Sequence, residues 1–196
     1  MTAQSARDVR LSYSLHGLQQ ATLRCEAASW HRPEDTFVAA AEAVSWVVAL
    51  DEALCTDAPG WDGKTYKESR NESDDGRTVI GMMFVRHNVH HAAELQPFIS
   101  LNAVVGNSEF GMRAGWLWTD LEELLPFLDA RFTSGRGLYG SHLAGHDVVH
   151  TLLDANRWFS SLNPPLPGLP PDETGMPREA FVLPVRWPPI EDERRV

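Results

Sequence analysis

Apolar residues in the first quarter of the chain recur at the spacing of amphipathic helices. From Ala6 to Ala28 this spacing is loose and interrupted by Gly17. Pro33 then suits the first turn of a second helix, and Glu34 and Asp35 suit the positive end of its dipole. The apolar positions of this second helix follow at i, i+3, i+4 spacing: Phe37, Ala40, Ala41, Val44, Val47 and Val48. We therefore expect two consecutive helices, the second running to about Leu54.

Polar residues dominate the next segment, from Thr56 to Thr78. Turn signals occur at Pro59-Gly60, Asp62-Gly63 and Asp75-Gly76, so this segment is predicted to be a loop with room for a short helical piece. An apolar run follows, and Pro97 marks where it has to stop. A third long helix is predicted over roughly residues 78–96.

Beyond Pro97 the pattern shortens to that of strands and brief helices. Residues 98–105 alternate, and glycines punctuate the way to Trp116-Leu117-Trp118, so a β-hairpin is predicted near 98–118. Thr119-Asp120 suits the cap of a short helix through Phe127, and Asp147 to Leu162 has the pattern of a final amphipathic helix. The fold class expected is mainly α: a helical bundle with a small hairpin.

The last segment, residues 163–196, is rich in proline and is expected to be an extended tail packed on the body. Its predicted anchors are Phe181, Val182, Val185 and Trp187. The 196 residues, 43% of them hydrophobic, suit one domain, which we place at 1–162.

Composition narrows the classes of function. The net charge of −10 disfavours broad attraction to nucleic acid, so any contact with RNA has to be made by a local basic pocket. Cys25 and Cys55 form neither a metal cluster nor a disulfide framework. The absence of a signal-peptide pattern and of a membrane-length apolar run predicts a cytoplasmic protein with no membrane partner.

Candidate chemistry is concentrated between Gly81 and Leu95, where Arg86, His87, His90 and His91 interrupt apolar sequence. Polar groups of this kind on a core helix need partners or a function. An arginine followed at similar spacing by a histidine also occurs at Arg10–His16, Arg24–His31 and Arg136–His142. Arg86 differs from those three because a polar residue, His87, follows it directly within a predicted helix.

This Arg86-His87-x-x-x-His91 pattern resembles the signature of HEPN-domain proteins. These are α-helical bundles, many of them metal-independent endoribonucleases of toxin–antitoxin and antiphage systems, and they favour asparagine, aspartate or histidine after the arginine. The order of features from Trp46-Val47-Val48-Ala49-Leu50-Asp51-Glu52 through the motif to Trp116-Leu117-Trp118 and Leu143-Ala144-Gly145 also resembles uncharacterised actinobacterial and actinophage proteins. Those proteins commonly carry an Arg-Asn-x-x-x-His helix at this place.

The HEPN resemblance implies a role for each motif residue. His91 would take the proton from a ribose 2′-hydroxyl, and Arg86 would neutralise charge on the attacked phosphate. His87 or Asn88 would orient the phosphate or the partner histidine. It also implies a homodimer with a composite site, an RNA substrate, no cofactor, and an antitoxin or other protein partner.

The polar loop adds candidates for substrate contact that do not depend on the resemblance. Trp61 lies there among basic residues that suit a phosphate backbone: Lys64, Lys67 and Arg70.

Two other functions remain open on the sequence. One is a noncatalytic helical dimerisation or scaffold protein. The other is a DinB-like bundle that binds a divalent metal through histidine pairs at i, i+4 spacing, His87 with His91 and His146 with His150, the latter pair extended back to His142. His146-Asp147-Val148-Val149-His150 also resembles a metalloprotease helix, with aspartate in place of glutamate. The alternative for His146 and His150 is an exposed first helical turn.

Overall fold

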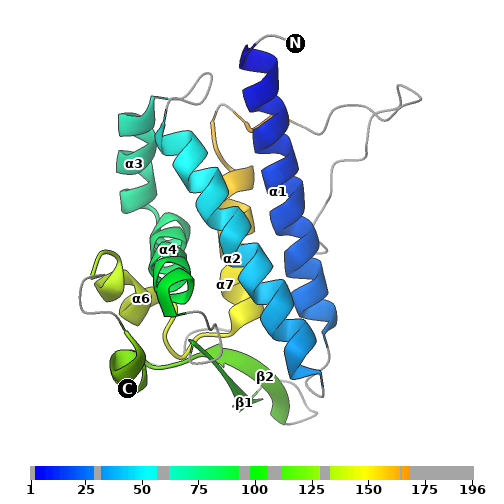
Figure 1. The fold of residues 1–196 in the computed structure, drawn as a ribbon, viewed down its shortest axis with the longest axis vertical. Helices are drawn as coiled ribbons and strands as arrows, with labels where there is room; N and C mark the ends of the chain where they lie inside the picture. The colour runs from blue at the N-terminus through cyan, green and yellow to red at the C-terminus, as the bar shows by residue number, and fades with distance from the viewer. Residues whose placement is uncertain are drawn as a thin grey trace.

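Two long antiparallel helices, α1 (Ala3–Ala27) and α2 (Pro33–Cys55), form one side of the protein (Figure 1). The computed structural model describes residues 3–28, 32–56, 62–92, 98–105, 112–128, 133–163 and 165–167. Both helices were expected from the spacing of their apolar residues. At their contact, the ring of Trp46 covers Gly17 so closely that a Cβ on Gly17 would overlap it. The glycine that interrupts the first pattern therefore allows α1 to approach α2.

The polar segment after α2 was predicted as a loop with room for a short helical piece, and it is more helical than that. Its described part from Gly63 onward is helical, in α3 (Gly63–Glu72) and the start of α4 (Asp74–Ala92). The Asp62 side chain caps α3 by accepting hydrogen bonds from the backbone N–H groups of Lys64 and Thr65. The apolar run thus belongs to a helix that begins at Asp74 rather than near residue 78.

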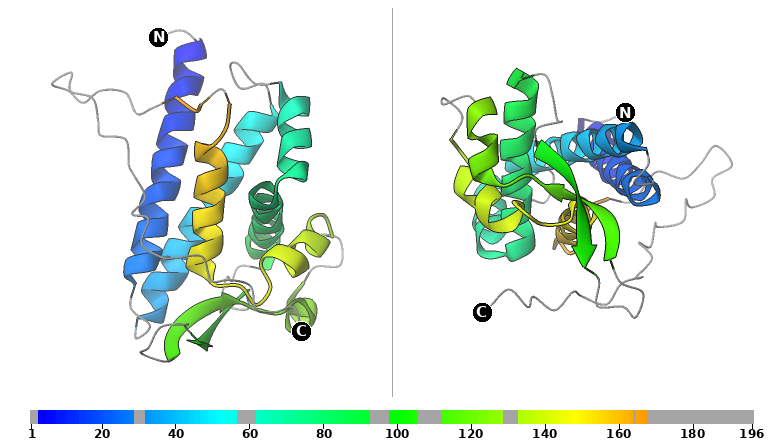
Figure 2. Two further views of the ribbon diagram at one scale, coloured as in Figure 1. Left: turned by 180° about the vertical axis from the view of Figure 1, so that it is seen from behind. Right: turned by 90° about the horizontal axis from the view of Figure 1, so that it is seen from below.

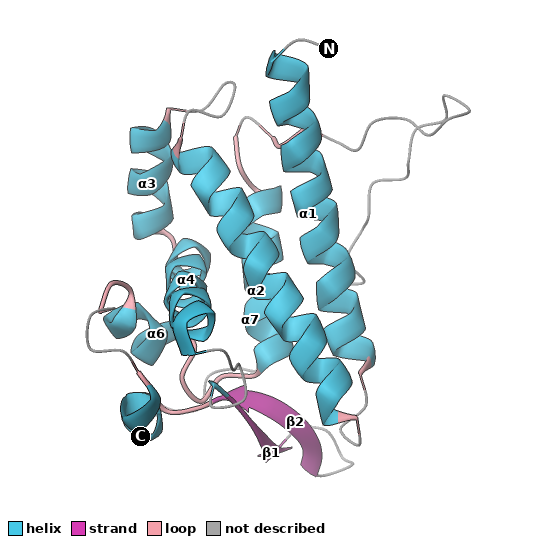
Figure 3. Ribbon diagram, viewed as in Figure 1, coloured by secondary structure: helices cyan, strands magenta, loops and turns pink. Residues whose placement is uncertain are grey.

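The predicted hairpin is confirmed. Strands β1 (Ile99–Val105) and β2 (Met112–Trp118) pair antiparallel, with Ile99 opposite Trp118, and lie across one end of the bundle (Figure 3). The Trp118 indole donates to the Thr151 hydroxyl at 2.7 Å, which joins the hairpin to α7 (Val148–Ser160). The short helix expected after Asp120 is present as α5 (Leu121–Leu124) with a 3₁₀ turn, η2 (Leu125–Phe127).

A helix that was not expected, α6 (Arg136–His142), packs on α4. The two meet through Gly81 and Gly135: a Cβ on Gly81 would come within 2.5 Å of Leu143, and one on Gly135 would lie 2.9 Å from the Ile80 carbonyl oxygen. Gly135 also has a φ of 80°, which favours glycine. The final helix α7 agrees with its prediction, and Asp147 caps it by accepting from the His150 N–H.

The core lies between α1, α2, α4, α6, α7 and the base of the hairpin. Trp118 and Trp158 are buried in it, and Trp46 and Trp116 pack against it. None of the described helices is long and apolar enough to cross a membrane. Leu166 packs against the core, whereas the predicted tail anchors, Phe181, Val182, Val185 and Trp187, lie outside the described residues.

Candidate functional site

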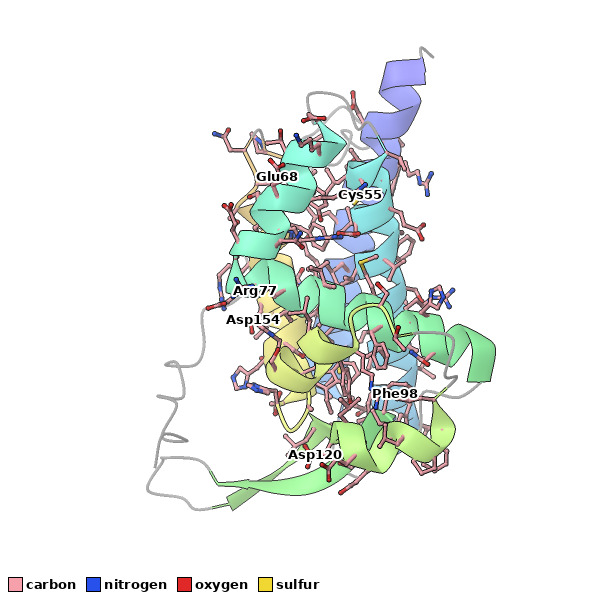
Figure 4. The ribbon with its side chains drawn as sticks, turned by 90° about the vertical axis from the view of Figure 1, so that its left-hand side faces the viewer. Cys55, Glu68, Arg77, Phe98, Asp120 and Asp154 are labelled. Atoms are coloured by element: carbon pink, nitrogen blue, oxygen red, sulfur yellow. The ribbon has the colours of Figure 1, made fainter. Side chains whose placement is uncertain are left out.

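The helix that carries the arginine and the histidines crosses the bundle instead of running along it. α4 starts beside α3 and α7, crosses α2, and extends its C-terminal end beyond α2 (Figure 2, Figure 4). Its middle is buried through Val79, Met82, Phe84 and Val85. Arg86, half-buried, and His87, exposed, follow directly, and Asn88 is buried again.

Arg86 is half-buried on α4. Its guanidinium donates no hydrogen bond to a described residue and forms no ion pair with one. The same is true of half-buried Arg136, whereas five described arginines have carboxylate partners: Arg24 with Glu42, Arg32 with Asp35, Arg70 with Asp51, Arg77 with Asp74, and Arg157 with Asp75 and Asp154. A guanidinium without an internal counter-ion is available to an anion from outside.

His87 is exposed, and His91 lies one helical turn further along α4. The side chain of His91 is outside the described structure, so only its helical position is known. Five residues separate Arg86 from His91, which places the two positions about 140° apart around the helix axis. Positions 86 and 91 therefore lie on different sides of α4.

Asn88 does not fit the substrate contact expected for it, because it is buried, with 1% of its surface exposed. Its amide nitrogen donates to the Phe84 carbonyl oxygen one turn earlier, at 2.9 Å. Its Oδ1 is also buried and has no hydrogen-bond partner. In this structure Asn88 contributes to the interior of α4 rather than to a surface that RNA could reach.

Arg70, another expected substrate contact, lies in a buried polar network between α2, α3, α4 and α7. Its guanidinium donates to both carboxylate oxygens of Asp51. The Tyr66 hydroxyl also donates to Asp51, at 2.8 Å, and accepts a longer hydrogen bond from the Trp158 indole, at 3.4 Å. The Arg70 guanidinium lies 3.5 Å from the sulfur of Met83 on α4. Arg70 thus stabilises the fold through Asp51 and is not free to bind a phosphate.

The network changes the acidity of its members. Burial lowers the pKa of the Arg70 guanidinium, but the hydrogen bonds and charge of Asp51 outweigh this effect and leave the pKa raised. Burial, followed by the charge of Asp51, raises the pKa of Tyr66. The same two causes, in the same order, raise the pKa of the Cys55 thiol to about 11. These groups hold their protons at neutral pH, which suits a structural network better than acid–base catalysis.

Lys64 and Lys67 are exposed on α3. Lys64 lies 3.8 Å from Glu68 in a surface ion pair. The structure brings neither lysine to Arg86, and Trp61, expected beside them, lies outside the described residues. Among the candidates on the described part of α4, Arg86 and His87 are adjacent in sequence, and position 91 lies one turn beyond His87.

The three histidines near α6 and α7 that were considered for metal binding lie in different places: at the end of α6, before α7 and within α7. His142 ends α6, 3.9 Å from Asp74, and His150 lies in α7, 3.8 Å from Asp147. His146 precedes the cap of α7, so the helical i, i+4 geometry expected for His146 and His150 is absent. In the part of the chain that the structure describes, no three His, Cys, Asp or Glu side chains are arranged to hold a metal ion.

Sequence reasoning missed Asp51 and Tyr66, the partners of Arg70. The available signal was local: Tyr66 and Arg70 are one helical turn apart, and Asp51 lies at helical spacing from the apolar positions Val44, Val47 and Val48 of α2. The partnership itself depends on how α3 folds back on α2, which no short-range pattern encodes. No family model, no curated protein and no solved structure matches this chain.

Proposed function

We propose that the protein is a HEPN-like endoribonuclease whose active site is completed by a second copy of the chain. The observation that carries the proposal is Arg86, a half-buried guanidinium with no described internal partner, in the C-terminal half of α4. Such a group suits charge that develops on a phosphodiester. The sequence resemblance supplies the reaction class, because it assigns the arginine and His91 to RNA cleavage.

In the proposed reaction His91 removes the proton of a ribose 2′-hydroxyl. The freed oxygen attacks the adjacent phosphorus, a 2′,3′-cyclic phosphate forms, and the 5′-oxygen of the next nucleotide leaves with a proton from a general acid. Arg86 neutralises the charge on the phosphoryl oxygens. His87, exposed next to Arg86, is the candidate to orient the phosphate or to act as the acid.

A composite site follows from the helix geometry. Positions 86 and 91 point about 140° apart on one helix, so a single α4 does not direct both groups at one phosphate. Two α4 ends related by a two-fold axis can place the arginine of one copy opposite His91 of the other. The proposed active species is therefore a homodimer, and an antitoxin partner would act by covering this end of α4.

The test is cleavage of a fluorescent single-stranded RNA by purified wild type, Arg86→Ala and His91→Ala, each with and without a metal chelator. Loss of a general base or of a charge-stabilising group costs about 10²- to 10⁴-fold in rate. Arg24→Ala and His150→Ala are matched controls, because they remove the same residue types from α1 and α7. We expect cleavage that persists in chelator, yields a cyclic phosphate end, and fails only in the two motif variants. An inert wild type would overturn the proposal and leave the scaffold function.

A further inference from the structure

Arg136, the first residue of α6, is a second half-buried arginine whose guanidinium forms no hydrogen bond and no ion pair with a described residue. Arg86 on α4 is the other. A guanidinium stays charged at neutral pH, and a half-buried one without a carboxylate partner has lost part of its hydration. An anion from outside the chain can replace that lost solvation. The position of Arg136 relative to the motif on α4 decides whether both arginines can bind the same phosphate.

α6 runs antiparallel to α4, and it begins beside the middle of that helix. At the end of α6, His142 Nε2 lies 3.9 Å from Oδ1 of Asp74, the first residue of α4. Just before α6, a Cβ on Gly135 would lie 2.9 Å from the Ile80 carbonyl oxygen. Arg136 directly follows Gly135, so its backbone lies beside the turn of α4 that begins at Ile80.

The same side of α4 carries the motif histidine. Ile80, Phe84, His87 and position 91 follow one another at intervals of four, three and four residues, so they fall within about 60° of arc around the helix axis. A Cβ on Gly135 would lie 3.3 Å from the Phe84 Cβ. His87 and position 91 follow Phe84 by about 5 and 10 Å along the axis. A long arginine side chain and a bound phosphate can together bridge the distance from the start of α6 to this part of α4.

Arg86 lies on a different side of α4, about 100° from His87 and 140° from position 91. We infer that Arg136 binds the scissile phosphate beside His91 of its own chain, whereas Arg86 reaches the same phosphate from the second copy. Each site then contains two guanidinium groups, which suits a phosphodiester whose oxygens gain charge during cleavage. This inference rests on the proposed function and adds a phosphate-binding residue to its site.

The first test compares RNA cleavage by Arg136→Ala, Arg136→Lys and the control Arg24→Ala in the full chain. The Arg136 side chain has no described polar partner, so Arg136→Ala should fold, which circular dichroism verifies; Arg136→Gln replaces it if it does not. We expect kcat/KM to fall by about 10²-fold or more in Arg136→Ala, to recover partly with lysine, and to be unchanged in Arg24→Ala.

Binding of a single-stranded 2′-O-methyl RNA separates phosphate contact from a structural role, because this RNA lacks the attacking hydroxyl and is not cleaved. Loss of one phosphate contact should reduce the steepness of log K against log salt concentration by about 0.7 in Arg136→Ala. The slope should be unchanged in Arg24→Ala. An unchanged slope in Arg136→Ala overturns the inference.

Subunit exchange then shows which chain Arg136 serves. A mixture of Arg136→Ala with Arg86→Ala should regain about a quarter of wild-type activity, because each mixed dimer keeps one intact site. A mixture of Arg136→Ala with His91→Ala should regain nothing, because each site of the mixed dimer lacks one of the two residues. Any other pattern overturns the inference. An active wild type with a fully active Arg136→Ala removes this inference alone, whereas an inert wild type removes the proposed function with it.

Discussion

Asp51 on α2 and Arg70 on α3 form a buried ion pair in which one guanidinium nitrogen donates to both carboxylate oxygens. Only 1% of the Asp51 side chain and 11% of the Arg70 side chain are exposed. The Tyr66 hydroxyl donates to the same carboxylate. The pair thus fixes a short polar helix, α3, against the most apolar helix of the bundle.

Removal of Arg70 is expected to destabilise the fold strongly. Arg70→Ala leaves the Asp51 carboxylate buried without its counter-ion, which costs about 3–5 kcal/mol of unfolding free energy. Arg24→Ala breaks the exposed pair with Glu42 and is expected to cost at most about 1 kcal/mol. Urea unfolding followed by circular dichroism measures both. Equal losses in the two variants would show that the buried pair does not hold α3.

The Cys55 thiol is expected to react slowly with alkylating reagents in the native protein. Its pKa is raised from 9.0 to about 11, so at pH 8 its thiolate fraction falls about 100-fold. Alkylation with iodoacetamide should be slow in buffer and fast in urea, while Asp51→Asn should speed the native reaction by removing a charge that raises this pKa. A native rate equal to the rate in urea would contradict this assignment.

The same shift predicts a pH dependence of stability. The folded pKa of Cys55 lies above its ordinary value, so the folded state keeps a proton that the unfolded state loses. The contribution is complete below about pH 9 and is lost as the pH rises toward 11. Unfolding free energy should fall over this window, and the fall should be smaller in Cys55→Ala. An unchanged slope in that variant would assign the alkaline loss to other groups.

Two glycines near the start of α6 are expected to respond oppositely to alanine. Gly135 has a φ of 80° and lies against the Ile80 carbonyl, so Gly135→Ala should destabilise by about 1–3 kcal/mol. A Cβ on Gly137 meets no atom within 4 Å, and alanine favours a helix, so Gly137→Ala should stabilise by about 0.5–1 kcal/mol. Thermal unfolding measures both effects: Tm should fall in Gly135→Ala and rise in Gly137→Ala. Stabilisation by Gly135→Ala would show that α6 approaches α4 differently.

The cap of α7 offers a similar comparison. Asp147 accepts a hydrogen bond from the His150 N–H, so Asp147→Ala should cost about 1 kcal/mol. Asp120 stands before α5 without a side-chain capping bond, and Asp120→Ala should cost less. The difference between the two unfolding free energies checks this prediction, and a larger loss at Asp120 would count against it.

Local patterns were sufficient for the long elements. Pro33 with the apolar spacing of α2 predicted that helix to within a residue or two at its end, and the alternation after residue 98 predicted the hairpin. The segment after α2 was predicted as a loop with room for a short helical piece, and its helical part is longer than expected because turn-forming Asp62 and Gly63 are the cap and first residue of α3. Gly63 lies closely against the Cys55 carbonyl at the end of α2, and this approach depends on how the connection between α2 and α3 turns, which sequence spacing does not encode.

The candidate site was predictable only in part. His87 is exposed, as a residue that contacts substrate would have to be. The burial of Asn88 and Arg70 was not predictable, because it depends on which side of α4 and of α3 packs against the core. The expected helical pairing of His146 with His150 failed for a similar reason. Asp147 caps α7, so the helix begins after His146 and does not include it. The catalytic roles of Arg86 and His91 remain predictions.

The most direct test of the composite site is complementation between two inactive variants. Arg86→Ala and His91→Ala are each purified, mixed in equal amounts, allowed to exchange subunits, and assayed for RNA cleavage. If each site takes its arginine from one copy and His91 from the other, half of the dimers are mixed and each has one intact site, so about a quarter of wild-type activity returns. A mixture as inactive as its two components, beside an active wild type, would contradict the shared site.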